Sequence, residues 1–342
     1  MANQLAFGSG QAAPAISDQP LGGGRDAAAR LVRAVLRNKK ALVGLGLLVF
    51  VVFVSLFPGL IAPGDPHAAK FDPNLGSVPG HPLGTTQIGE DVFTQLVYGT
   101  RLTLIITVVV GLFTTVLSVI VGLTSAYLGG NADRVLSLLT DVFLIIPTLP
   151  LLIVLSAYLS GSGTVAIIGV LTVTGWAFGA RQLRAQGLSM RNRDFLEAAR
   201  ARGEGTTYII VMEILPNMLS LVVATFLNSS VYTVATAAGL QFLGLGNSND
   251  ITWGTMLHFA QQNGALWSGN VLWALAPGAA VAVLGTAFAL LNYAFDELTN
   301  PALRSVRRRK SRLAAVPAAG ASGSASGAGG GAGSAKTEPS RG

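Results

Sequence analysis

The residues whose types and spacing most suggest a function lie in a polar stretch between two apolar runs. Asp194 and Glu197 stand three positions apart, followed closely by Ala198, Ala199 and Gly203. The acidic pair resembles a capping box with Asp194 as N-cap, and Gly203 stands where a left-handed C-cap is expected. This pattern is suited to the docking of a partner, because alanine side chains let the backbone of the partner approach closely.

One face of this expected helix carries four residues at the spacing i, i+3, i+4, i+7: Phe195, Ala198, Ala199 and Arg202. A helix of about two turns is unstable alone in water, so neighbours must hold it. Pro216 ends the following segment, and Asn217 can cap the next helix. Local physics leaves an ordinary solvated arginine loop as the alternative.

Groups for catalysis or metal binding are sparse. The chain has no cysteine, and its three histidines, His67, His81 and His258, lack metal-ligand spacing. None of the five lysines follows a glycine, so a phosphate-binding loop G-x-x-x-x-G-K-[ST] is absent. We therefore expect a non-catalytic chain without a metal site or an ATP site of its own.

The elements that position these residues are membrane spans. The chain is 51% hydrophobic and only 11% charged, against about 25% charged in soluble domains. About 20 apolar residues cross a bilayer, and lipid forces them to be helical. The sequence predicts an all-α, polytopic membrane protein with six spans, near residues 41–61, 102–126, 136–159, 164–182, 218–240 and 271–294.

The predicted spans divide the chain into three parts. We expect residues 1–40 to form a basic, partly disordered cytoplasmic tail, whose first 24 residues lack the apolar core of a signal peptide. Residues 41–304 form the transmembrane domain, with a cytosolic loop at 183–217. Residues 305–342 are basic and then Ala/Gly/Ser-rich, so we expect them to be disordered.

The distribution of charge predicts the topology. Of the 23 Lys and Arg residues, 21 fall in the two tails or in the loops on the same side of the spans. The positive-inside rule places that side, with both termini, in the cytoplasm. Basic clusters beside a membrane span favour contact with anionic lipid over nucleic acid.

Polar side chains inside the apolar runs are candidates for a translocation path: Asp141, Asn228, Ser229, Ser230 and Asn292. Asp141 lies about one to two turns from Arg134, near the predicted cytoplasmic end, so a structural ion pair or an interfacial position is its favoured interpretation. The small polar residues serve equally well to hold helices together. Residues 91–97 have an apolar face suited to the membrane surface before the second span. Trp253, Trp267 and Trp273 fit an interfacial aromatic belt.

The stretch around Glu197 resembles the EAA loop of bacterial ABC-importer permeases. Residues 81–101 and 240–257 are similar to stretches of the dipeptide and oligopeptide permeases, and the C-type subunit matches best over 41–304. The resemblance implies the type I importer permease fold and a coupling helix that docks on an ATPase subunit. The coupling positions implied are Asp194, Glu197, Ala198, Ala199, Arg202, Gly203 and Pro216. Glu213 departs from the family, where a basic residue is common.

The resemblance further implies partners: a homologous second permease, two ABC ATPase subunits that carry ATP and Mg, and an extracytoplasmic binding protein. It implies import of dipeptides or oligopeptides across the bacterial inner membrane, with nickel or another metal chelate as the alternative cargo. Two interpretations from other classes are a secondary transporter, for which the sequence lacks a clear inverted repeat, and a membrane scaffold without transport.

Overall fold

The structure is a computed structural model that describes residues 38–159 and 163–299. Within those ranges every regular element is a helix, which confirms the all-α prediction. Most of the predicted N-terminal tail and the whole of the predicted tail at 305–342 lie outside the described residues.

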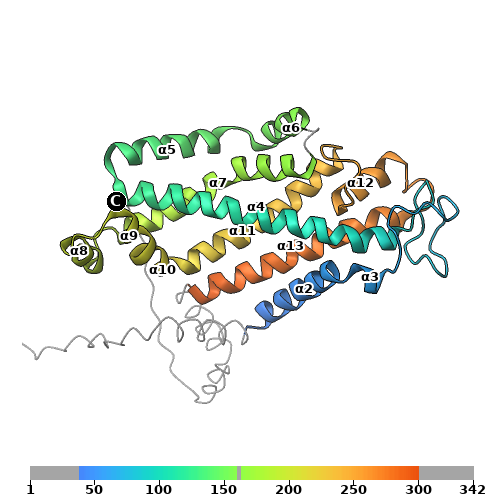
Figure 1. Cartoon of the computed structure of the whole chain (residues 1–342), viewed down its shortest axis with the longest axis horizontal. Coiled ribbons are helices and arrows are strands. Elements are labelled where there is room, and N and C mark those ends of the chain that lie inside the picture. The colour runs from blue at the N-terminus through green and yellow to red at the C-terminus, as the bar shows by residue number, and fades with distance from the viewer. Residues whose placement is uncertain (1–37, 160–162, 300–342) are drawn as a thin grey trace, which may run out of the picture. The chain divides into compact units, whose positions relative to one another are not determined.

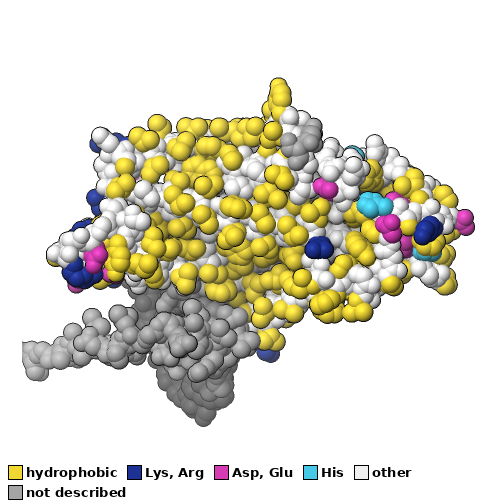
Figure 2. Space-filling model, viewed as in Figure 1, with side chains coloured by type: hydrophobic (Ala, Val, Ile, Leu, Met, Phe, Trp, Pro, Cys, Tyr) yellow, Lys and Arg dark blue, Asp and Glu magenta, His cyan; other side chains and the backbone are white. Residues whose placement is uncertain are grey.

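Five helices of the described chain are long and apolar enough to cross a membrane: α2 (Lys39–Leu56), α4 (Val92–Leu128), α7 (Gly163–Met190), α11 (Leu219–Phe242) and α13 (Val271–Thr299). They run side by side along the long axis of Figure 1. The pair α5 (Gly130–Ile145) and α6 (Thr148–Tyr158) makes six if it counts as one broken span. Hydrophobic side chains cover the middle of the face in Figure 2, and charged ones gather towards its two ends.

The stretch predicted as one helix at 136–159 is bent by 87° between α5 and α6. Ile146 is extended, with φ −64° and ψ 128°, and Pro147 follows it. The residue before a proline disfavours the helical region, and the proline itself donates no backbone hydrogen bond. The apolar run therefore contains two helices.

Residues 91–97 form the start of α4 and pack in the bundle, instead of lying on the membrane surface before the second span as predicted. The Asp91 carboxylate caps α4 by accepting from the backbone N–H of Thr94 at 2.8 Å. Val92 and Val97 are then buried in the bundle, at 0% and 5% exposure. The cap explains why α4 begins ten residues before the predicted span at 102.

Helices α4 and α7 pack closely because glycines face the contact. A Cβ at Gly122 would lie 2.6 Å from the carbonyl oxygen of Ala180, and one at Gly179 would lie 2.6 Å from the Ser118 hydroxyl. The Ser118 Oγ in turn donates to the backbone oxygen of Trp176 at 2.7 Å. This close contact joins α4, which precedes α5, to α7, which leads to the polar segment.

The predicted aromatic belt is mostly wrong. Trp253 and Trp273 are 2% and 1% exposed and belong to the hydrophobic core, and only Trp267 is exposed. The indole Nε1 of Trp253 donates to the backbone oxygen of Leu96 at 3.1 Å. Trp253 opens the short helix α12 (Trp253–Gln262), which folds back against α11 and α13 and so covers both rings.

Candidate functional site

The polar segment forms a short helix, α8 (Asp194–Ala201), at one end of the bundle (Figure 1). α7 continues to Met190, so the first eight residues of the predicted loop 183–217 are helical. The predicted N-cap is wrong: Arg193 holds that position with extended φ and ψ, and Asp194 is the first helical residue. Asp194 and Glu197 both lie in the first turn, where the negative charge of a carboxylate interacts favourably with the helix dipole.

The predicted left-handed cap is confirmed at Gly203, whose φ is +81°. The N–H of Gly203 donates to the Arg200 oxygen at 2.9 Å, and the N–H of Glu204 donates to the Ala199 oxygen at 3.2 Å. This pair of bonds is a Schellman motif, which satisfies carbonyls at the helix end. It turns the chain sharply after two turns of helix.

Burial divides the α8 residues into two sets. Leu196 and Ala199 are 0% exposed and pack against Leu123 of α4 and Leu183 of α7, among others. The outward set is exposed: Asp194, Glu197, Ala198, Arg200 and Ala201. The neighbours that a two-turn helix needs are therefore the ends of two long helices. The face that remains open carries two alanines, Ala198 and Ala201, among charged side chains.

Two arginines link α8 to the segments around it. Arg202 NH2 lies 3.2 Å from Glu213 Oε1, so the acid at the unusual position is the ion-pair partner of a predicted coupling residue. Arg200 NH2 donates to the backbone oxygen of Arg191 at 3.2 Å, and its guanidinium lies 5.3 Å from the Tyr127 ring centre.

The chain returns to the bundle through α9 (Thr206–Tyr208), a π-helical turn η2 (Ile209–Ile214) and α10 (Leu215–Asn217). Pro216 lies in the first turn of α10, where a proline costs no hydrogen bond. Asn217 does not cap the next helix: its Nδ2 donates to the Glu213 oxygen at 2.7 Å, and Met218 is the N-cap of α11.

A cavity of about 380 Å³ lies among α4, α5, α6, α7 and α11. Its polar lining comes from Thr114, Thr148, Thr174, Gln182, Thr225, Asn228, Ser229, Tyr232 and Thr233. Small-molecule sites usually measure about 300–1,000 Å³ and combine an apolar wall with a few polar groups. The side chains of Phe143, Leu144, Leu171 and Phe178 supply such a wall.

Two of the five path candidates, Asn228 and Ser229, line this cavity. Ser230 is fully buried and donates to the Phe226 oxygen at 2.9 Å. Asn292 lies on α13 and is not part of the lining, and its buried Oδ1 has no hydrogen-bond partner within the described part of the chain.

Asp141 is also outside the cavity lining, and its predicted pairing with Arg134 is wrong. Its Oδ1 lies 3.4 Å from NH2 of Arg181, on α7. Arg134 instead donates to Asn131 at 3.4 Å. The partner of Asp141 is distant in sequence, so local spacing could not identify it.

Sequence reasoning missed Gln182 and Tyr232 in the cavity wall. On α11 the lining residues Thr225, Asn228, Ser229 and Tyr232 follow the spacing i, i+3, i+4, i+7. That periodicity of polar side chains within an apolar helix was the available signal.

Two family patterns match the chain. The binding-protein-dependent transport system inner membrane component matches residues 115–304, and the N-terminal TM domain of oligopeptide transport permease C matches residues 28–77. Between them they cover most of the described helices.

Individual relatives agree with this match. The dipeptide transport system permease protein DppC of Bacillus subtilis is 31% identical over 226 residues, 66% of this chain and 70% of its own. The oligopeptide transport system permease protein OppC of Mycobacterium bovis is 30% identical over 285 residues, 81% of this chain and 96% of its own. Among solved structures, an inward-facing MetNI methionine ABC transporter chain matches with a TM-score of 0.47 and 24% identity, over 59% of this chain and 96% of that one.

Proposed function

The chain belongs to the family of binding-protein-dependent transport system inner membrane components, and on that premise we propose that it is the permease subunit of a peptide importer. The proposed cargo is a dipeptide or an oligopeptide delivered by an extracytoplasmic binding protein. Its relatives are named dipeptide and oligopeptide permeases, which supports this cargo.

The observation that carries the proposal is the packing of α8 against the long helices. Its buried residues, Leu196 and Ala199, pack on the ends of α4 and α7, so a force on the exposed face reaches the membrane helices. We propose that this exposed face, which includes Glu197 and Ala198, binds to the surface of an ATPase subunit. Gly203 ends the helix, and the ion pair between Arg202 and Glu213 holds the return segment beside it. Pro216 lies in the first turn of α10 within that segment.

The 380 Å³ cavity is the proposed translocation path of this subunit. Asn228 and Ser229 offer hydrogen bonds to a peptide, while Phe143 and Phe178 receive apolar side chains. A homologous second permease completes the path. ATP binding to the partner subunits drives transport by favouring one conformation over the other, and ATP and Mg reside on those subunits.

In the proposed orientation both termini and α8 face the cytoplasm and the loop 62–91 faces outward. The uneven distribution of Lys and Arg supports this orientation. The chain is then a multi-pass protein of the bacterial inner membrane whose apolar flanks contact lipid.

The test is ATP-dependent uptake of labelled dipeptides and longer peptides into liposomes that contain the complete transporter and its binding protein. The expected result is uptake that needs all components and ATP. Uptake of a nickel chelate in place of peptides would contradict the peptide assignment. Uptake driven by an ion gradient without ATP would contradict the importer itself.

A further inference from the structure

A second cavity, of about 150 Å³, lies at the end of the bundle opposite α8. Its walls come from the loop 62–91, the start of α4, the 247–251 turn, α12 and the start of α13. We call it the loop cavity. Its lining is His67, Thr86, Gln87, Ile88, Glu90, Gln95, Ser248, Asp250, Ile251, Thr255, Met256, Phe259 and Trp273.

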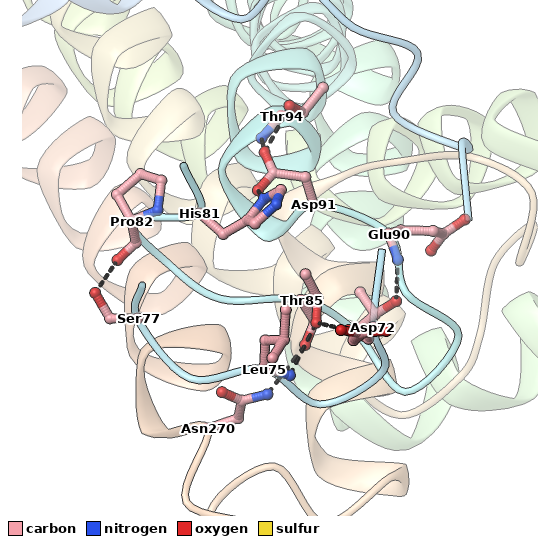
Figure 3. A network of polar contacts seen from close by, with 11 residues as sticks. Asp72, Leu75, Ser77, His81, Pro82, Thr85, Glu90, Asp91, Thr94 and Asn270 are labelled. Atoms are coloured by element: carbon pink, nitrogen blue, oxygen red, sulfur yellow. Dashed lines mark hydrogen bonds and ion pairs between the residues drawn. The ribbon is translucent and has the colours of Figure 1, made fainter. Parts of the chain in front are cut away.

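The loop that covers this cavity is held in place by polar contacts, several of which are drawn in Figure 3. The Thr85 hydroxyl donates to the Asp72 oxygen at 2.7 Å, and the Thr85 carbonyl accepts from Asn270 Nδ2 at 3.0 Å. His81 Nδ1 lies 2.9 Å from Asp91 Oδ1. These contacts connect the loop to the starts of α13 and α4, so hydrogen bonds fix the position of the loop that forms part of the cavity wall.

Two buried polar atoms of the lining residues have no hydrogen-bond partner among the residues that the structure describes. Trp273 is 1% exposed, and its indole Nε1 finds no acceptor. Gln87 Oε1 is likewise buried and accepts no hydrogen bond. A ligand that supplies an acceptor to the indole and a donor to the amide oxygen would satisfy both atoms, and leaving a buried polar atom unpaired is unfavourable.

The cavity wall also carries negative charge. Glu90 Oε2 accepts from Gln95 Nε2 at 2.7 Å, and Asp250 accepts from Asn247 and Thr164. All of these donors are neutral, and no ion pair within the described residues involves either carboxylate. A cation in the cavity would therefore meet uncompensated charge.

We propose that the loop cavity binds the protonated amino end of a peptide. The ammonium group donates to Glu90 and Gln87, and the first carbonyl oxygen accepts from the Trp273 indole. Met256 and Phe259 give the first side chain an apolar wall. A cavity of this size holds a molecule about as large as benzene, which suits the first aminoacyl unit of a peptide.

A bound metal ion fits these observations less well, because an indole N–H cannot ligate a cation. The described residues also contain no cluster of three or more His, Asp or Glu side chains suited to a metal. The inference rests on the proposed peptide import, and it makes the loop cavity a checkpoint for the amino end of the cargo on the outward side.

The test uses the complete membrane complex in nanodiscs, with 5-fluorotryptophan incorporated and the Trp273 resonance identified by its loss in Trp273→Phe. The probe is L-alaninamide, which has an ammonium group and a carbonyl. N-acetyl-L-alaninamide is the matched control that lacks the ammonium group. The expected result is a saturable shift of the Trp273 signal with the first probe only.

Glu90→Gln should weaken the binding of L-alaninamide by about tenfold or more, because a charged hydrogen bond is lost. Asp72→Asn, an exposed acid of the same loop outside the cavity lining, should leave it unchanged. If neither probe shifts the Trp273 resonance, the cavity holds only water and the proposal is overturned, even if peptide uptake proceeds normally. Equal shifts with both probes overturn the ammonium assignment, whereas selective binding without peptide uptake would contradict only the transport function.

Discussion

Arg184 and Asp133 form a two-bonded ion pair between α7 and α5: Nε to Oδ1 measures 2.6 Å, and NH2 to Oδ2 measures 2.7 Å. Ser125 of α4 also contacts both groups, with its hydroxyl 2.5 Å from Asp133 Oδ1 and 3.2 Å from Arg184 Nε. Three helices therefore meet at one carboxylate. α5 leads to the bent pair, so this contact holds the start of the only interrupted stretch among the candidate spans in the described chain.

Asp133→Asn should lower the thermal stability of the purified chain. The pair is partly buried, with side chains 20% and 32% exposed, so we expect a loss of about 1–3 kcal/mol, between exposed and buried ion pairs. The matched control is Asp141→Asn, whose pair with Arg181 is exposed at 47% and 65%. That change should cost less than about 1 kcal/mol. Equal melting shifts in detergent would show that the three-helix contact is unimportant.

Gly203→Val should abolish uptake while the chain still inserts at normal levels. The φ of +81° at Gly203 strains a β-branched residue by about 1–3 kcal/mol, which disrupts the Schellman turn. Gly203→Asn should retain part of the activity, because asparagine tolerates this region. Gly205→Ala is the control, since Gly205 has φ −70°. Peptide uptake and membrane levels are the measurements, and wild-type uptake by Gly203→Val would remove the role of the turn.

Ala198→Asp and Ala199→Leu should fail in different ways. Ala198 is exposed, so Asp there should leave the membrane level and melting temperature normal but uncouple ATP hydrolysis from the loaded binding protein. Ala199 is 0% exposed, so Leu should destabilise the fold by about 1–3 kcal/mol through overpacking. If Ala198→Asp couples normally, the exposed face of α8 is not the docking surface.

Ser229→Trp should block peptide uptake by filling the 380 Å³ cavity. The neighbouring Ser230→Ala removes a buried hydroxyl outside the cavity and should transport nearly normally, with a stability loss of about 0.5–1.5 kcal/mol. Initial uptake rates, with the docking of the ATPase checked by co-purification, distinguish a blocked path from a broken complex. Equal rates in both variants would contradict the path assignment.

Single cysteines at Ser189 and Ser248 test the proposed orientation, because the chain has no native cysteine and both serines are exposed. An impermeant thiol reagent added outside intact cells should label Ser248→Cys and spare Ser189→Cys. Labelling of Ser189→Cys alone would show that the topology is the reverse of the proposed one.

Features set by neighbouring residues could be read from the sequence. The apolar runs predicted the long helices, because any lipid-facing backbone must bond within its own segment. The cap at Gly203 followed from its place after a short amphipathic run. The family match confirms the resemblance drawn from the residues around Glu197.

Only the tertiary structure decided features that depend on contacts between distant segments. Asp141 pairs with Arg181 rather than Arg134, and Trp273 lies in the core rather than at an interface. The choice between Ser229, in the cavity, and Ser230, in a helix contact, depends on how α11 rotates against α4 and α7. Apolar periodicity is weak in a helix that lipid and protein both surround, so rotation and pairing come from close packing between helices, which spacing along one segment does not encode.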